Sequence, residues 1–448
     1  MKSTQKMHRE TPLPDERNWL IRRIKDVSRI NPATRIPKNQ LVDFFPMEAI
    51  GVNGGLSREL KKDSGQANGY SQFKNNDVLF AKVTPCFENG KSAIGYALTT
   101  GVALATTEVT VLRPSKNITP AFLHYRIKGL DFAIGGKNEM KGSGGLKRVP
   151  EKYVADFRFG LPCRDEQNRI AAWLDLQTTR IDQRRELLGK KRELLRDLKK
   201  SVIEETTFRG VAAGVEIRDS GIGWLGQVPA HWTTMRLGSL FREAADAGID
   251  GLPMLSVSLH TGITDKELDD EEMERKVSRS EDRTLYKRVK PGDLVYNQMR
   301  AWQGAFGAAK IEGLVSPAYV VARPGRVVVP RFVEYLLRAP AAMEEIRRRS
   351  RGITDFRLRL YWDEFKNIRI ALPPLKEQED IANFLDRKLS QIDRQTALID
   401  QLDDLLKQQR KAIIHEAVTG KIDLSGSPVG DKLSPTEVVR PPAMREEF

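Results

Sequence analysis

The sequence contains one segment twice, and this repeat constrains the fold more than any other feature. Residues 161–205 (LPCRDEQNRIAAWLDLQTTRIDQRRELLGKKRELLRDLKKSVIEE) align without a gap to residues 372–416 (LPPLKEQEDIANFLDRKLSQIDRQTALIDQLDDLLKQQRKAIIHE) at an offset of 211. Sixteen of the 45 pairs are identical. Fainter similarity continues upstream, for example between Tyr125 and Tyr335 at an offset of 210. The chain therefore consists of two copies of one unit, each a globular part followed by a helical part.

Apolar residues recur at every seventh position of both repeated segments. Five consecutive heptads predict long helices that pair as a coiled coil, the first from about residue 166 to 206. A second, partial row widens the stripe that one partner helix would cover; it comprises Trp173, Leu187, Leu194, Leu198, Phe384, Leu398, Leu402 and Leu405. The main row, which we predict to form the helix-pairing surface, comprises Leu174, Ile181, Leu188, Leu195 and Val202, and then Leu385, Ile392, Ile399, Leu406 and Ile413.

Each helix needs a partner, since its stripe would otherwise face water. The partner is either a second chain, in a homodimer, or the other helix of the same chain. We favour antiparallel pairing within one chain, because the two stripes match in length and the residues between the helices are numerous enough to let the helices meet. The pair would then act as a rigid spacer between the globular parts.

The globular parts show the patterns of short strands and helices. Segments such as FKNNDVLFAKV and ATTEVTVLRP in the first copy, and RVKPGDLVYNQMR and VSPAYVVARP in the second, are β-branched runs bounded by Gly, Pro and Asn. Each copy then has a helical stretch, ITPAFLHYRIKGL or VVPRFVEYLLRAPAAMEEIRRR. These patterns predict two mixed α/β domains with open sheets.

The charge of the chain favours a polyanionic partner. It has 74 Lys and Arg against 60 Asp and Glu, a formal charge of +14, which fits nucleic acid or an anionic membrane. Arg, Lys, Asn and Gln side chains neutralise phosphates and read base edges, although any one of them is more typical of a solvated surface. The candidate DNA-binding residues are Asn75, Asn76, Lys82, Lys91, Lys137, Asn138, Lys141, Ser143, Lys147 and Arg148, and then Asn297, Gln298, Arg300, Gln303, Arg349, Arg351, Thr354 and Arg357.

Two loops stand out among these candidates. The Gly-rich loop KGSGGLKRV (141–149) and its counterpart SRGITDFRLRL (350–360) combine backbone amides with basic side chains in both copies. Trp302 either stacks on a base or fills the core.

Catalytic motifs are not found in the sequence. The segment ENGKS (88–92) lacks the first glycine of a phosphate-binding loop, and the acidic segment ELDDEEMER (267–275) is more typical of a solvated surface than of a metal site. We therefore expect no catalytic or metal site in this chain.

Cysteine content and hydropathy limit the cellular compartments that suit the chain. Only Cys86 and Cys163 are present, so neither a disulfide framework nor a four-cysteine zinc site can form, and a reducing cytoplasm fits. The first 17 residues lack the apolar core of a signal peptide, and no run approaches the roughly 18 apolar residues of a membrane span.

The repeated segments, the stretch GWLGQVPAHWTTMRLGSLF (223–241), the strand PGDLVYNQMR and the segment IIHEAVTGKID closely resemble the specificity subunit of type I restriction-modification systems. The resemblance covers about residues 18–424. The first copy departs from the pattern at Cys163, Arg164 and Asp165, where the second copy has Pro374, Leu375 and Lys376. The start of the first helix is therefore the less certain of the two.

This resemblance implies a division of the chain and a set of partners. It implies a target recognition domain at 18–160, a central conserved helix at 161–210, a second recognition domain at 211–371 and a C-terminal conserved helix at 372–424. Disordered tails are expected at 1–17 and 425–448. The implied partners are double-stranded DNA, two methyltransferase subunits and motor-nuclease subunits. The resemblance also implies that the methyltransferase subunits dock on the paired helices, so the main apolar row is expected to serve subunit docking as well as helix pairing. The implied cofactors, S-adenosylmethionine for methylation and ATP with Mg²⁺ for restriction, belong to those subunits and not to this chain.

Two alternatives to a DNA-reading subunit remain at this point. A self-contained endonuclease or methyltransferase would need catalytic motifs that we do not find. A coiled-coil scaffold without nucleic-acid function would not need the basic loops.

Overall fold

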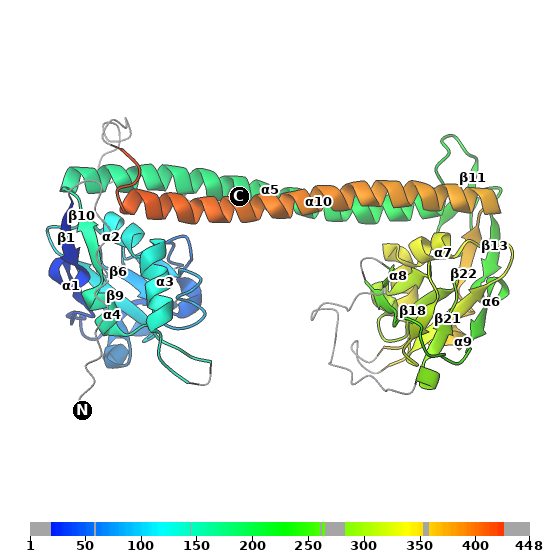
Figure 1. The fold of residues 1–448 in the computed structure, drawn as a ribbon, viewed down its shortest axis with the longest axis horizontal. Helices are drawn as coiled ribbons and strands as arrows, with labels where there is room; N and C mark the ends of the chain where they lie inside the picture. The colour runs from blue at the N-terminus through cyan, green and yellow to red at the C-terminus, as the bar shows by residue number, and fades with distance from the viewer. Residues whose placement is uncertain are drawn as a thin grey trace, which may run out of the picture. The chain divides into compact units, whose positions relative to one another are not determined.

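The structure is a computed structural model that describes residues 19–57, 60–143, 145–259, 262–264, 283–352 and 358–424. The expected tails at 1–17 and 425–448 and the acidic segment 267–275 lie outside these ranges. The chain forms two compact units, one comprising the residues up to Leu188 and those from Gln401 onward, the other Gly189–Asp400. Each unit therefore contains one globular part and halves of both long helices (Figure 1).

The first unit contains most of the first copy. Its strands are β1 (Leu20–Arg23), β2 (Ser28–Ile30), β3 (Leu41–Phe45), β4 (Leu60–Asp63), β5 (Ser71–Lys74), β6 (Val78–Ala81), β7 (Ser92–Ile94), β8 (Val102–Ala105), β9 (Val109–Pro114) and β10 (Arg158–Leu161). Its helices are α1 (Ile24–Val27), α2 (Pro120–Arg126), α3 (Leu130–Glu139), α4 (Glu151–Asp156), the short 3₁₀ helices η1 (Met47–Ala49) and η2 (Ser64–Gly69), and the first part of α5 (Arg164–Arg209).

The second unit contains the second globular part. Its strands are β11 (Ile217–Asp219), β12 (Gln227–Pro229), β13 (Thr233–Arg236), β14 (Phe241–Ala244), β15 (Ser256–Ser258), β16 (Gly262–Thr264), β17 (Lys287–Val289), β18 (Leu294–Asn297), β19 (Phe306–Ala308), β20 (Gly313–Val315), β21 (Tyr319–Pro324) and β22 (Arg369–Leu372). Its helices are α6 (Leu237–Leu240), α7 (Pro330–Leu337), α8 (Pro340–Arg349), α9 (Trp362–Phe365), the 3₁₀ helices η3 (Arg283–Leu285) and η4 (Ala301–Gln303), and the first part of α10 (Leu375–Val418).

Both units are built around the same four-stranded antiparallel sheet. Its strand order is β2-β9-β6-β7 in the first unit and β14-β21-β18-β19 in the second. A buried aspartate before the central strand pairs with an arginine of the neighbouring strand in the sheet, Asp77 with Arg113 of β9 at 2.8 Å and Asp293 with Arg323 of β21 at 2.9 Å. The first unit adds a second sheet, β4-β3-β8-β5. The mixed α/β fold and the tandem repeat predicted from the sequence are therefore present.

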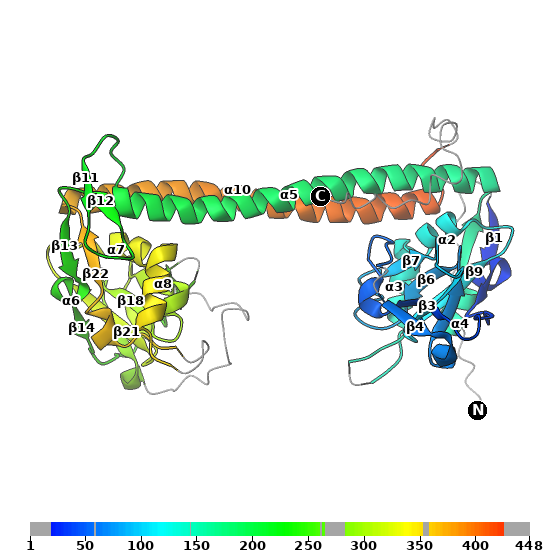
Figure 2. The same ribbon diagram turned by 180° about the vertical axis from the view of Figure 1, so that it is seen from behind.

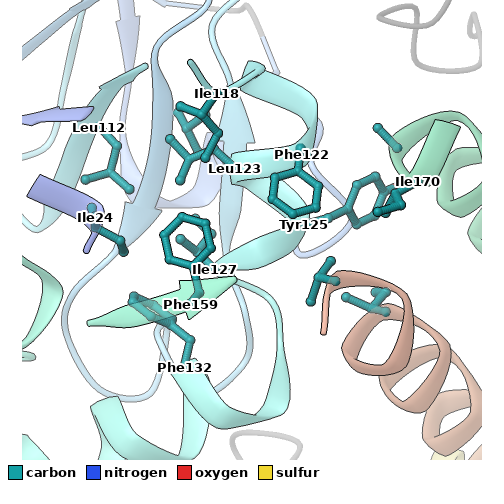
Figure 3. Close-up of a cluster of buried hydrophobic side chains, with 14 of the residues drawn as sticks. Ile24, Leu112, Ile118, Phe122, Leu123, Tyr125, Ile127, Phe132, Phe159 and Ile170 are labelled. Carbon is teal, nitrogen blue, oxygen red and sulfur yellow. The ribbon is translucent and has the colours of Figure 1, made fainter. Parts of the chain in front are cut away.

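The core of the first globular part extends into the long helices. Its largest cluster includes Phe122, Leu123 and Tyr125 from α2 together with Ile170 and Leu174 from α5. Figure 3 shows Phe122 and Tyr125 directed toward Ile170. The cluster also includes residues near the end of α10, namely Ile414, Ala417 and Val418. The globular part is therefore held to both helices by a shared apolar core rather than by a flexible linker.

The predicted helices form, with two differences. Helix α5 has 46 residues and begins at Arg164, slightly earlier than expected, so the departure at 163–165 does not disrupt its start. Both long helices are followed by a glycine with positive φ, Gly210 at 78° and Gly420 at 80°, which is the usual residue after a helix C-terminus. The stretch 328–349 is two helices and not one, because Pro340 lacks the amide hydrogen needed within a helix and instead begins α8.

Candidate nucleic-acid interface

A basic two-stranded loop follows α3 in the first unit. The amide of Lys141 donates to the carbonyl oxygen of Arg148 at 3.0 Å, and the amide of Arg148 donates back at 2.8 Å. Gly142 has a φ of 148°, and a Cβ there would lie 2.2 Å from the carbonyl oxygen of Leu146. The tight turn therefore requires glycine at this position. Figure 1 shows the segment after α3 projecting from the globular part.

Hydrogen bonds fix this loop at the end of the central strand β6. The amide of Val149 donates to the carbonyl oxygen of Lys82 at 2.8 Å, directly after the strand. The hydroxyl of Thr84 donates to the carbonyl oxygen of Gly145 at 2.9 Å and accepts from the amide of Lys147 at 3.0 Å. Sequence reasoning missed Thr84, which is a small hydroxyl residue with no distinguishing motif.

The charges of the loop are mostly not neutralised. Arg148 forms an ion pair with Glu108 at 2.7 Å, which raises the pKa of the guanidinium and lowers the pKa of the carboxyl group. Within the described ranges, no carboxylate lies at ion-pair distance from Lys82, Lys141 or Lys147. Half-buried Lys82 and exposed Lys141 and Lys147 therefore give the end of β6 a net positive charge, which suits contacts with phosphates.

The other first-copy candidates lie in four places. Lys137 and Asn138 are in the last turn of α3, close in sequence to the loop, and Lys137 pairs with Glu88 at 2.8 Å. Ser143 is exposed within the loop. Lys91 donates to the carbonyl oxygen of Met47 at 2.8 Å. Asn75 and Asn76 are in the turn before β6, at the opposite strand end from the loop, where the Asn75 side chain accepts from the amide of Leu98 and Asn76 has a φ of 71°.

The second unit has the corresponding loop at the end of β18. Arg351 and Arg359 exchange two backbone hydrogen bonds of 3.0 Å, as Lys141 and Arg148 do. The amide of Leu360 then donates to the carbonyl oxygen of Gln298 at 2.9 Å, as Val149 donates to Lys82. The two sequence-predicted loops therefore occupy the same position in the two copies. Thr354 and Arg357 lie outside the described residues.

Helix η4 lies beside this second loop and carries polar candidates. Gln303 is exposed, and Arg300 precedes the helix. The guanidinium of Arg347 lies 5.9 Å from the ring centre of half-buried Trp302, whose indole N–H donates to Met299. The remaining candidates take part in local contacts: Asn297 is buried and accepts from the amide of Met299, Arg349 pairs with Glu345 at 2.6 Å, and Arg351 pairs with Glu364.

A second candidate surface lies on the long helices. In the first unit, Asp182 of α5 pairs with Arg410 of α10 at 3.1 Å, and Arg185 pairs with Asp403 at 2.7 Å. In the second unit, Arg192 pairs with Asp400 at 2.5 Å and Lys199 with Asp393 at 2.6 Å. In these pairs the residue numbers rise along α5 as they fall along α10. The two helices therefore run antiparallel in each unit, as Figures 1 and 2 show.

The two predicted apolar rows of these helices differ in burial. Seven residues of the main row are buried, whereas Leu188, Val202 and Ile413 are half-buried. The second row was wrongly predicted to be covered by the partner helix. Trp173 and Phe384 are half-buried, and the row's leucines are exposed, because the ion-paired partner covers only one side of each helix; these are Leu187, Leu194, Leu198, Leu398, Leu402 and Leu405.

One buried glutamine connects each globular part to the long helix that follows it in the sequence. Gln167 accepts from the amide of Thr119 at 2.8 Å and donates to the carbonyl oxygens of Asn117 and Pro162. Gln378 makes the equivalent bonds to Val329, Val327 and Pro373. Both side chains are fully buried. In the sequence, the two glutamines are an identical pair at offset 211. This identity marks them as a shared feature of the two copies, but it does not show that they connect the globular part to the helix.

Two further identical pairs reinforce this connection. The indole of Trp19 donates to Glu166 and that of Trp232 to Glu377, both at 3.1 Å. The hydroxyl of Tyr125 donates to Asp175 at 2.6 Å, and Tyr335 donates to Asp386. Burial raises the pKa of Asp175 to about 6. These contacts fix the orientation of each globular part on its own helix.

Asp175→Asn is expected to stabilise the fold at pH 7. The folded-state pKa of about 6 exceeds the usual 3.8, so the carboxyl group's contribution to stability is lost as the pH rises from about 4 to about 6. An amide keeps the acceptor for Tyr125 without burying a charge, so we expect a gain of roughly 1–3 kcal/mol at pH 7 and little change at pH 4. Urea unfolding at the two pH values measures this.

The matched control is Asp386→Asn in the second copy. This carboxylate also pairs with Arg331 and both side chains are partly exposed, so its removal is expected to cost no more than about 1 kcal/mol at pH 7. Equal stability of the parent and Asp175→Asn chains at both pH values would contradict the assignment of a buried charge.

Two kinds of site are absent from the described residues. No group of three or more His, Cys, Asp or Glu side chains is arranged to hold a metal ion within these ranges. None of the helices in the described part of the chain is both long and apolar enough to span a bilayer.

Comparisons with known proteins point to one family. A profile described as Type I restriction modification DNA specificity domain matches residues 16–188 and 345–408, more than half of the chain. The type I restriction enzyme EcoAI specificity subunit of Escherichia coli is 36% identical over 162 residues, 35% of this chain and 27% of that protein. The MjaVIII specificity subunit of Methanocaldococcus jannaschii is 24% identical over 336 residues, 71% of this chain and 74% of that protein.

A solved structure shows the same fold. It comes from a study of complex assembly and conformational transition of the type I R-M system and has a TM-score of 0.68 at 18% identity, covering 92% of this chain and 100% of that one. The sequence match to the EcoAI and EcoEI subunits spans only about a quarter of their length, 27% in each case.

Proposed function

The chain belongs to the type I restriction-modification DNA specificity family, and on this premise we propose that it is the subunit that reads the DNA sequence in a type I restriction-modification complex. Residues 18–160 and 211–371 act as two target recognition domains, each reading one half of a bipartite, asymmetric site. The observation that carries this proposal is the basic two-stranded loop that occurs at the same strand end in both copies. A shared position with different side chains is what two readers of different half-sites require.

The long helices serve the rest of the complex. The regions 161–210 and 372–424 set the gap between the half-sites and bind two methyltransferase subunits. The exposed leucines support this role, because Leu187 and Leu398, and likewise Leu194 and Leu405, are equivalent positions of the repeat. Equivalent apolar surfaces on two helices suit two copies of the same partner.

The chain contributes recognition and not catalysis. S-adenosylmethionine for adenine methylation is bound by the methyltransferase subunits, and ATP with Mg²⁺ by the restriction subunits that complete the complex. The complex acts in the cytoplasm. A coiled-coil scaffold without DNA-reading function is not supported, because it explains neither the family membership nor the duplicated basic loops.

Genome-wide mapping of adenine methylation tests the proposal. The chain is co-expressed with its neighbouring methyltransferase subunit in a host that lacks such systems, and the methyltransferase subunit alone is the reference. We expect one split, asymmetric motif that appears only when the chain is present. A stable complex without new methylation would contradict sequence reading, and failure to form a complex would favour the scaffold.

Loop variants make this test specific to the interface. Lys141→Ala with Lys147→Ala removes two exposed charges and is expected to lower methylation at least severalfold through lost phosphate contacts. Lys116→Ala removes an exposed lysine outside the loop and is expected to leave methylation unchanged. Equal methylation by all three chains would exclude the loop from the interface.

A further inference from the structure

A cavity of about 280 Å³ lies in the first unit, apart from the basic loop. Its walls come from the turn between β6 and β7, the segment joining α2 to α3, and the last part of α10. The apolar part of the lining includes three core phenylalanines, Phe80, Phe87 and Phe132, together with Ile127 and Ile414. The ring centres of Phe87 and Phe132 are 6.1 Å apart. A lining of this kind suits an aromatic or apolar ligand body.

The polar part of the lining is strongly cationic. Five of its side chains are basic, namely Lys91, Lys128, Lys137, Arg410 and Lys411, whereas Glu88 is its one acidic side chain. Glu88 and Asp182 pair with Lys137 and Arg410, respectively. Lys91 and Lys128 donate only to backbone carbonyl oxygens, of Met47 and Val52, in the contacts of the described chain. Several charges therefore face the cavity without a carboxylate in contact.

Among these basic side chains, Lys128 is the one whose pKa is lowered. Burial, and next the nearby charge of Arg410, lower its pKa to about 7, although Asp182 and Asp175 act in the opposite direction. Holding two cations close together in a partly dry site is unfavourable unless an anion joins them. Asp182 is paired with Arg410, whereas the ammonium group of Lys128 is bonded to the carbonyl oxygen of Val52.

The second copy shows how the same position is neutralised without a ligand. Arg338 corresponds to Lys128 at offset 210, and the amides of both donate to the equivalent tyrosines, Tyr335 and Tyr125. Arg338 pairs with Glu334 of α7 at 3.1 Å, and this carboxylate also accepts from the amide of Ala308 in β19.

The first copy has no carboxylate at the position of Glu334. His124 stands there, buried and 3.1 Å from the hydroxyl of Ser92 in β7. Burial lowers the pKa of His124 well below its usual value, so the ring is neutral. The negative charge that the second copy has in α7 is therefore missing from the equivalent helix α2 of the first copy, one turn before Lys128.

We propose that this cavity binds a small aromatic anion, whose phosphate or carboxylate group contacts Lys128, Arg410 and Lys411 while its ring lies against the phenylalanines. Because α10 supplies Arg410, Lys411 and Ile414, a bound ligand would contact both the globular part and the helix. The proposal does not depend on the DNA-reading function.

Isothermal titration of the full chain tests the site with two probes. Phenyl phosphate and benzoate carry the same aromatic ring and differ in the anionic group, which is a phosphate in one and a carboxylate in the other. Binding of either probe supports the site, and the stronger probe identifies the anionic group. Absence of binding by both at millimolar concentration would overturn the proposal.

Variants locate the binding in the cavity. Lys128→Met keeps the length of the side chain without its charge and is expected to weaken binding at least about tenfold, as loss of a charge-assisted hydrogen bond does. Lys411→Gln alters an exposed residue and cannot unfold the core, and it is expected to weaken binding severalfold. Lys116→Met is the matched control and should bind as the parent does. Binding that neither cavity variant weakens would place the probe elsewhere and overturn the assignment.

Discussion

A chain carrying Leu194→Asp and Leu405→Asp is expected to fold as stably as the parent chain and to lose the methyltransferase subunits. The two side chains are 70% and 59% exposed, so a carboxylate there costs no more than about 0.5 kcal/mol of folding free energy. On an apolar docking surface, the same charge must be desolvated against the partner, which costs roughly 2 kcal/mol or more per site. Co-purification with a tagged methyltransferase subunit, alongside thermal unfolding of the chain alone, measures both effects.

The adjacent leucines provide a matched control. Leu195 and Leu406 are 8% and 6% exposed and belong to the buried row. Aspartate at these positions places an unpaired charge between the helices, at a cost of roughly 3–5 kcal/mol each, so we expect both stability and subunit binding to fall. Unchanged co-purification of the Leu194→Asp and Leu405→Asp chain would contradict docking on the exposed leucines.

The sequence predicted the fold through its periodicities, which report burial. Heptad spacing located the long helices because a seven-residue repeat keeps side chains on one face. The second row failed as a prediction because periodicity shows that Leu187 and Leu194 lie on one face of their helix, but not what covers that face. Exposed leucines on a solvated helix and leucines under a partner give the same pattern, and only the position of the neighbouring helix separates them.

The candidate interface was predicted only in part, for a related reason. The loops 141–149 and 350–360 were identified because glycine and basic residues coincide in both copies. Asn75 and Asn76 looked similar by residue type, yet they serve a turn at the opposite end of β6, which composition does not distinguish. The glutamines Gln167 and Gln378 were visible as an identical pair, but the partners in the globular parts, such as Thr119 and Val329, lie 48 or 49 residues earlier in the sequence.

Inserting one heptad between Leu188 and Gly189 and another between Asp400 and Gln401 is expected to lengthen the gap between the half-sites by about three base pairs. Seven residues add about 10 Å of helix and almost two full turns, so the buried row keeps its face. Base pairs are spaced about 3.4 Å apart. The ion pairs Arg185–Asp403 and Arg192–Asp400 lie on opposite sides of the insertions and stay in register.

The methylated motif, read from genome-wide adenine mapping, measures the new gap. Three base pairs also turn the DNA through about 100°, at about 10.5 base pairs per turn, so methylation at the new sites is expected to fall severalfold. Five-residue insertions at the same points are the control, since at 3.6 residues per turn they rotate the buried row by about 140° and disrupt pairing. An unchanged gap in a stable heptad-insertion complex would mean that the methyltransferase subunits, and not these helices, determine the distance between the half-sites.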